Sequence, residues 1–111
     1  MTAVEVWTPV CALAAVLPDR GVAALLDGGE QVAVFRTVDE VYALSNMDPF
    51  SGAAVLSRGL VGDVGGVPVV ASPMHKQRFD LRTGSCVDDP AVSVAVYPVR
   101  VADGVILVGR P

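Results

Sequence analysis

The chain has 111 residues, of which 52% are hydrophobic and 18% charged, and its formal net charge is −4 at pH 7. This length predicts a single domain, and the acidic balance argues against a surface that binds nucleic acid or an anionic membrane. So large an apolar fraction is typical of a core rich in small hydrophobic residues, of apolar surface kept for a partner, or of both.

The beginning of the chain predicts no targeting signal. MTAVEVWTPV has neither a charged region nor a long apolar stretch, and the apolar run at residues 10–17 is too short to cross a bilayer, which takes ~20 residues. We therefore expect a soluble, cytoplasmic protein. Cys11 and Cys86 lie in dissimilar contexts, which favours two free, buried thiols and leaves a disulfide as the alternative.

The first part of the chain predicts a meander of antiparallel strands. Alternation around Trp7 predicts an edge strand over residues 4–9, and the segment after it, as far as Gly21, predicts one helical turn or a wide loop. Three strands follow, joined by turns whose glycines readily take a positive φ. These strands are expected at residues 22–26, 31–37 and 41–45, with turns at 27–29 and 38–40.

From residue 46 to residue 89 the strand-like pieces become short and the turns dense. Brief strands are expected at 67–71 and 78–81, and the glycines of 62–66 predict a flexible turn, because a phosphate-binding loop would need a lysine and a following helix. Regular strands return over 92–108. The lack of helical periodicity predicts an all-β antiparallel sandwich or barrel with a loop-rich segment inserted.

Two proline-containing turns, SNMDPFSG and SPMHKQRFDL, carry a resemblance to a known family. Their spacing resembles the two loops of a Rieske iron–sulfur domain, of which one holds Cys-x-His and the other Cys-Pro-x-His. The resemblance continues to the closing YPVRVADGVILV. It implies one Rieske-like domain over 1–111, with framework strands at about 1–45 and 91–111 and a degenerate cluster-loop subdomain at about 46–90.

The ligand positions of these loops have changed. A Rieske [2Fe–2S] centre takes two thiolates on one iron and two imidazoles on the other. Aligning the loops puts Asp48 and Ser72 at the cysteine positions and Phe50 and His75 at the histidine positions. Lys76 stands where the second loop usually has glycine. With three of four ligands gone, the resemblance implies that this chain binds no cluster and no other cofactor.

One Rieske-like family is known for this loss, the small subunit of cytoplasmic NAD(P)H-dependent assimilatory nitrite reductase. The chain is similar to it in SNMDPFSG, in LSRGLVGD with PVVASP, and in KQRFDLRTG. The family implies a large catalytic subunit that carries FAD, an iron–sulfur cluster and sirohaem and reduces nitrite to ammonia in nitrate assimilation. It implies an accessory role for this chain, with no activity of its own.

The loop tips are the candidate partner contacts, at Asp48, Phe50, Ser72, Met74, His75 and Lys76. We expect Asp48 and Ser72 to cap the turn backbone, and Phe50, Met74 and Met47 to fill the volume left by the cluster.

Other chemistry at these residues is weakly supported. His75 is the only histidine, and one imidazole is no metal site. No nucleophile motif surrounds Ser72, which disfavours a hydrolase. Lys76, Arg78 and Arg82 are either solvated surface or a docking patch for an acidic partner. Two alternative functions stay open: an electron-transfer protein for an oxygenase, which the missing ligands disfavour, and an iron-free β-sandwich module for another redox partner.

Overall fold

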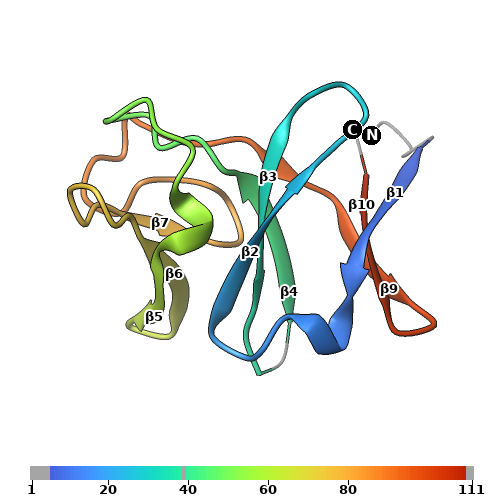
Figure 1. The fold of residues 1–111 in the computed structure, drawn as a ribbon. Coiled ribbons are helices and arrows are strands. Elements are labelled where there is room, and N and C mark those ends of the chain that lie inside the picture. Colours follow the sequence, from blue (N-terminus) through green and yellow to red (C-terminus); the bar gives the residue numbers. More distant parts are fainter. Residues whose placement is uncertain (1–5, 39, 110–111) are drawn as a thin grey trace.

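The computed structural model describes residues 6–38 and 40–109. Within them the chain forms strands and two short 3-10 helices (Figure 1). In chain order they are β1 (Trp7–Ala12), η1 (Leu13–Ala15), β2 (Arg20–Leu25), β3 (Gln31–Arg36), β4 (Val41–Ser45), η2 (Leu56–Arg58), β5 (Leu60–Val64), β6 (Val67–Ala71), β7 (Arg78–Asp80), β8 (Val96–Tyr97), β9 (Val99–Ala102) and β10 (Val105–Gly109).

The strands form three sheets in which neighbouring strands run antiparallel. Their orders are β1-β10-β9, β2-β3-β4-β8 and β5-β6-β7. In Figure 1 the sheet of β2, β3 and β4 stands in the middle, with β5–β7 on its left and β1, β9 and β10 on its right. The prediction of an all-β, antiparallel fold is confirmed.

The middle sheet separates two hydrophobic cores. Residues alternate along a strand between its two faces, so Ala33 and Phe35 of β3 pack in the core beside β5–β7 with Phe79. Val32 and Val34, which point the other way, pack beside β1 and β10 with Ile106. Both faces of β3 are therefore covered, which explains why four successive residues of an antiparallel strand are buried.

Strand β1 differs from its prediction at both ends. Residues 4 and 5 of the predicted strand lie outside the described residues, as does residue 39 of the predicted turn at 38–40. The strand does not end at Pro9 but continues to Ala12, because the pairing with β10 shifts between Pro9 and Cys11. A bulge on an edge strand tolerates a proline, which has no N–H to donate. The expected helical turn is present as η1.

The prediction of a flexible turn over residues 62–66 is wrong. Residues 62–64 belong to β5, which pairs with β6 from Leu60↔Ala71 to Val64↔Val67. Only Gly65 and Gly66 make the turn, both with positive φ, as a two-residue hairpin loop requires. Apolar residues on both sides of this glycine pair were a hairpin signal in the sequence.

The closing segment, expected as strands over 92–108, divides at Pro98. Before it, β8 pairs with β4, and after it β9 pairs with β10, so the chain passes from the middle sheet to the first. The third sheet lies inside the predicted loop-rich insert, and the division of the domain into framework and insert stays a prediction.

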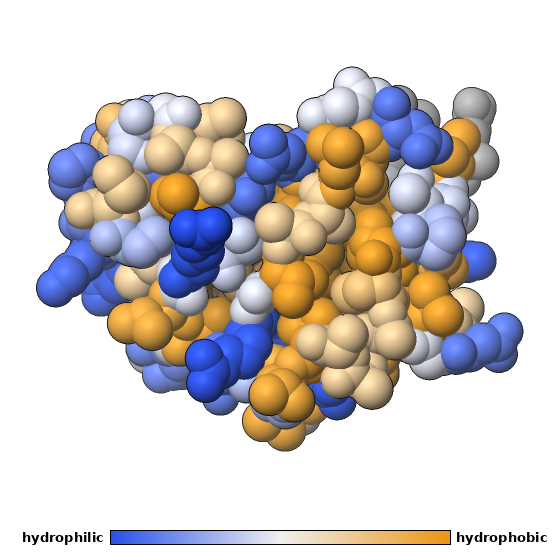
Figure 2. Space-filling view, viewed as in Figure 1, coloured by the Kyte–Doolittle hydropathy of each residue, from blue (hydrophilic) through white to orange (hydrophobic). Residues whose placement is uncertain are grey.

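Apolar residues fill the two cores, and others are exposed on part of the surface. Figure 2 shows them gathered over the half of the molecule that contains β1, β2 and β10. Leu17 and Leu25 are among the exposed large side chains. No helix within residues 6–38 and 40–109 is long and apolar enough to cross a membrane.

Candidate functional site

The two loops of interest, residues 48–53 and 72–77, share one backbone frame. In each loop the N–H of the first residue donates to the carbonyl of the sixth, and the carbonyl of the first accepts from the N–H of the fifth. The N···O distances for Asp48–Ala53, Gly52–Asp48, Ser72–Gln77 and Lys76–Ser72 are 2.8, 2.8, 2.9 and 3.0 Å. The expected role of Asp48 and Ser72 as turn formers is confirmed.

A side-chain cap completes each loop. Asp48 Oδ1 accepts from the N–H of Phe50 at 2.8 Å, and Ser72 Oγ accepts from the N–H of Met74 at 3.3 Å. Aspartate and serine favour turns because they can cap their own backbone in this way. Residues 80–85 form a third turn of the same kind. The chain's own polar groups therefore close the loops.

The two cysteine positions are joined directly to each other. Ser72 Oγ donates a hydrogen bond of 2.5 Å to Asp48 Oδ2 across 24 residues of sequence. Both residues are buried, with 0% of Asp48 and 1% of Ser72 exposed. In a Rieske domain the metal cluster links these positions, whereas here a buried hydrogen bond links them. The two loops consequently lie side by side at the left edge of Figure 1.

The carboxyl group of Asp48 is stabilised in its ionised form. Burial alone would raise its pKa, but hydrogen bonds from Ser72 and from the N–H groups of Phe50 and Ser51 outweigh burial and hold the pKa below the ordinary value of 3.8. Asp48 can therefore accept three hydrogen bonds as a carboxylate at neutral pH.

This shift predicts a specific loss of stability in acid. Because the pKa of Asp48 is lower in the folded chain, its contribution is complete above pH ~4 and disappears as the pH falls through the folded-state pKa. We expect Asp48→Asn to unfold more easily at pH 7 and to lose less stability than the wild type between pH 5 and pH 3. Urea unfolding at a series of pH values measures this. Parallel curves for the two proteins would contradict the assignment.

The expected apolar filling of the cluster volume is only partly observed. The ring of Phe50 packs against the buried Phe79, with centroids 6.2 Å apart, and 37% of Phe50 is exposed. Met47 and Met74 are 45% and 49% exposed, so the prediction that they fill the site is wrong. Phe50 and the two methionines are thus exposed apolar side chains in or next to the two loops.

Lys76 holds a backbone conformation that favours glycine. Its φ is 63°, and the equivalent residues of the other two turns are Gly52 at 73° and Gly84 at 78°. A side chain in this left-handed region costs roughly 1–2 kcal/mol.

We expect Lys76→Gly to be more stable than Lys76→Ala by about 1 kcal/mol. The two variants remove the same charge, and only the glycine relieves the left-handed strain. Comparison of their unfolding free energies in urea measures the difference. An alanine variant as stable as the glycine variant would show that position 76 carries no strain.

Asn46 is a structural residue that the sequence pattern did not single out. It is buried, its Oδ1 accepts from the N–H of Ser57 at 2.7 Å, and its Nδ2 donates to the carbonyl of Ala54 at 3.2 Å. It thereby ties the end of β4 to both the first loop and η2. Asparagine at the end of a strand is a turn signal, but the sequence does not tell which backbone groups it will meet.

Two members of the predicted basic cluster are neutralised by aspartates. Arg78 Nη2 lies 2.7 Å from Asp88 Oδ1, and Arg82 Nη2 lies 3.2 Å from Asp80 Oδ2. Hydrogen bonds from Arg78 lower the pKa of Asp88. Because both guanidinium groups are exposed to solvent, such pairs contribute little to stability. Lys76, which has no such pair among the described residues, is left as the free cation of the cluster.

The residues at the four ligand positions do not fit a [2Fe–2S] cluster. Asp48 and Ser72 supply no thiolate and are bonded to each other, and Phe50 has no lone pair to offer. His75 is exposed, and the Ser72 hydroxyl donates to Asp48, which also disfavours a hydrolase. Among the described residues no three of the histidine, cysteine, aspartate and glutamate side chains form a metal-binding group.

Neither cysteine can replace the missing ligands. Both are free thiols, as predicted. Cys11 is half-buried on β1, and burial raises the pKa of its thiol. Cys86 is buried in the core with Phe79. Both thiols therefore have packing roles outside the loops.

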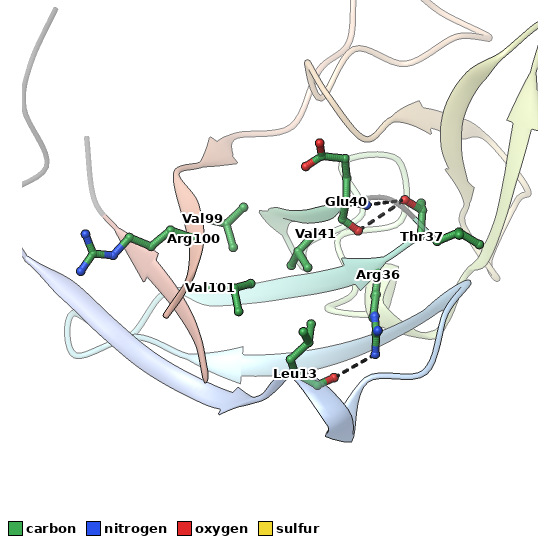
Figure 3. Close-up of a pocket in the computed structure, with 9 residues that line it drawn as sticks. Leu13, Arg36, Thr37, Glu40, Val41, Val99, Arg100 and Val101 are labelled. Atoms are coloured by element: carbon green, nitrogen blue, oxygen red, sulfur yellow. Dashed lines mark hydrogen bonds between the residues drawn. The ribbon is translucent and has the colours of Figure 1, made fainter. Parts of the chain in front are cut away.

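Another groove lies between β4 and β9, and the two arginines that line it have structural roles (Figure 3). Arg36, which lines it, donates to the carbonyls of Val16 at 2.9 Å and Leu13 at 3.3 Å and so anchors η1. Arg100 points away from the groove and lies over the ring of Trp7, at 4.8 Å from its centroid. Both guanidinium groups thus have contacts within the chain.

Comparison with known proteins agrees with this geometry. The model of the Rieske-like [2Fe-2S] domain family matches residues 6–109. The nitrite reductase (NADH) small subunit of Salmonella typhimurium is 51% identical over 102 residues, which cover 90% of this chain and 94% of that protein. A crystal structure from Mycobacterium tuberculosis, assigned as an NADH-dependent nitrite reductase small subunit, has 57% identity and a TM-score of 0.94 and covers 98% of both chains.

In a third relative, a similar sequence is part of a longer polypeptide. A nitrite reductase [NAD(P)H] large subunit of Klebsiella oxytoca is 48% identical over 104 residues. The match covers 94% of this chain and 11% of that protein. A domain of this kind is thus found both as a separate chain and as part of a large subunit.

Proposed function

Since this chain belongs to the Rieske-like domain family and, within it, to the small subunits of NADH-dependent nitrite reductase, we propose that it is the accessory subunit of such an enzyme. Its partner is the large catalytic subunit, which reduces nitrite to ammonia with electrons from NAD(P)H. The chain is part of an oxidoreductase and catalyses nothing alone. The observation that carries this function is its similarity to these small subunits over nearly their whole length.

The Klebsiella relative supports a direct and lasting association with the large subunit. In that protein a sequence 48% identical to this chain lies within the large-subunit polypeptide. A covalent link keeps two domains at a high effective concentration, so it favours interfaces that work as a one-to-one pair. The separate chain therefore needs a surface that provides the same association without a linker.

We propose that Met47, Phe50 and Met74, here called the apolar loop tip, form part of the surface that contacts the large subunit. These side chains are exposed although they are large and apolar, which is typical of partner contacts. Phe50 and Met74 belong to the two loops that the Asp48–Ser72 bond joins, and Met47 directly precedes the first of these loops. Methionine adapts its shape to a partner surface, and the exposed His75 and Lys76 follow on the same loop.

The role of this chain in the proposed complex is structural and not redox. The Asp48–Ser72 bond and the ring of Phe50 at the ligand positions support a chain without a cluster. We assign the FAD, iron–sulfur cluster and sirohaem to the large subunit as part of this proposal. We expect iron analysis of the purified chain to find no stoichiometric iron and its visible spectrum to have no iron–sulfur bands. Iron bound in proportion to protein would contradict this.

We place the complex in the cytoplasm. Two free cysteines, of which one is buried and one half-buried, are typical of proteins kept in a reducing compartment.

Nitrite-dependent NADH oxidation by the cognate large subunit, measured with and without this chain, tests the function. We expect the chain to raise the rate and to form a complex with the large subunit in gel filtration. Met74→Asp should weaken this complex, and Leu25→Asp, at another exposed apolar site on β2, is the matched control. No change in rate and no complex would overturn the accessory role. A stronger effect of Leu25→Asp would move the interface away from the loop tip.

A further inference from the structure

A second surface feature lies beside the loop tip. An open groove of about 330 Å³ runs between the η2–β5 junction and the second loop. Its lining is predominantly apolar, and it includes the buried Ser72 of the inter-loop bond. The other lining residues are Arg58, Gly59, Leu60, Ala71, Pro73 and Lys76.

The floor of the groove includes the small residues Gly59, Ala71 and Ser72. At Gly59 an added Cβ would lie 2.4 Å from the carbonyl oxygen of Ala71, so the end of η2 approaches β6 closely and leaves no room for a side chain at this position. Leu60 pairs with Ala71 in the β5–β6 ladder, yet 79% of Leu60 is exposed. A large apolar side chain thus stands uncovered at the edge of a groove with a small-residue floor. This arrangement can take an apolar side chain of a partner.

Two cations that form no ion pair among residues 6–38 and 40–109 flank this apolar floor. Most of the other cations in residues 6–38 and 40–109 are engaged, by Asp88 and Asp80, by backbone carbonyls or by the ring of Trp7. Arg58 and Lys76 are exposed and form no ion pair within the described part of the chain. On a chain with a net charge of −4, their joint position makes this groove locally positive.

We propose that this groove receives a segment of the large subunit in which a carboxylate side chain adjoins an apolar one. The carboxylate lies between Arg58 and Lys76, and the apolar side chain packs against Leu60 and Pro73. Opposite charges at the edge of an apolar contact orient a partner and raise its rate of association. The groove adjoins the second loop, so it extends the interface proposed above, on which this inference rests.

The dimensions and charge favour a protein segment over other ligands. Pockets for small molecules usually measure ~300–1,000 Å³ and enclose their ligand, whereas this open groove is at the lower end of that range. An anionic membrane would be repelled by the rest of the acidic surface. Two cations and one exposed leucine match a short acidic and apolar stretch of polypeptide.

Charge reversal with a matched control tests this proposal. The affinity of the wild type and of the variants Arg58→Glu, Lys76→Glu and Leu60→Ser for the cognate large subunit is measured at low and at physiological salt. Arg100→Glu is the control, because it changes the net charge by the same amount on β9, in another sheet. Circular dichroism verifies that each variant is folded, and Arg58→Gln and Lys76→Gln replace any charge-reversal variant that does not fold.

We expect Arg58→Glu and Lys76→Glu each to weaken binding about tenfold, with the larger loss at low salt, and Arg100→Glu to change it by less than about twofold. Leu60→Ser should weaken binding without changing its dependence on salt. If the wild type binds and both reversals behave as Arg100→Glu does, the groove is not the docking site while the accessory function stands. If the wild type itself does not bind, the proposed function fails and this inference fails with it.

Discussion

Replacing Asp48 by alanine is expected to lower the free energy of unfolding by about 3 kcal/mol, because three donors lose their common acceptor. The Ser72 hydroxyl and the N–H groups of Phe50 and Ser51 would be left without the carboxylate that they share. Domains of this size are stable by only ~5–15 kcal/mol, so the melting temperature should fall by roughly 10–20 °C. Thermal and urea unfolding at pH 7 measure the change.

A matched control and a double-mutant cycle complete this experiment. Asp63→Ala removes an exposed aspartate of β5 and should change stability by less than about 0.5 kcal/mol. A double-mutant cycle of Asp48→Ala with Ser72→Ala isolates the bond between the loops, and we expect a coupling energy of at least about 1 kcal/mol. Additive effects would show that the loops are held by their own caps and not by each other.

Gly59→Ala is expected to lower the free energy of unfolding about as much as Asp48→Ala does, but for a steric reason. The new Cβ would lie 2.4 Å from the carbonyl oxygen of Ala71 and 2.7 Å from Cγ2 of Val70, so β6 must move away from η2. The backbone at Gly59 is extended, with φ −73°, and strain in φ plays no part. Overpacking of this kind costs typically 1–3 kcal/mol and occasionally more; we expect about 3 kcal/mol.

Gly62 provides the control for this substitution. It lies three residues further along the chain, in β5, and a Cβ added there would meet nothing within 4 Å. Gly62→Ala should therefore leave the unfolding free energy unchanged or raise it by up to about 1 kcal/mol. Equal unfolding curves for the two variants in urea would mean that β6 moves away from η2 at little cost, and would contradict the expected overpacking.

Local signals in the sequence were sufficient for much of the fold. The predicted strands at 41–45 and 67–71 coincide with β4 and β6, and Asp48 and Ser72 cap their turns as expected. These features depend on neighbouring residues, which a sequence displays directly. The hairpin of β5 and β6 was missed although its signal was present, because the glycines of 62–66 were all assigned to the turn.

Contacts between distant segments were not predictable in the same way. The bond from Ser72 to Asp48 spans 24 residues, and no spacing rule relates a serine in one loop to an aspartate in another. The exposure of Met47 and Met74 was not predictable either, because burial depends on how the folded segments pack against one another. The ion pair of Arg78 with Asp88 likewise depends on how the chain returns after β7.

The position of β3 between two cores has a consequence for how the molecule unfolds. Since Phe35 belongs to one core and Val34 to the other, loss of either core would expose one face of the same strand to water. Neither half can melt while leaving the other intact. The loop-bearing end, where a partner would dock, is therefore expected to unfold in one cooperative transition with the opposite end. Binding of the partner at the loops should consequently protect amide hydrogens of β1 and β10 from exchange.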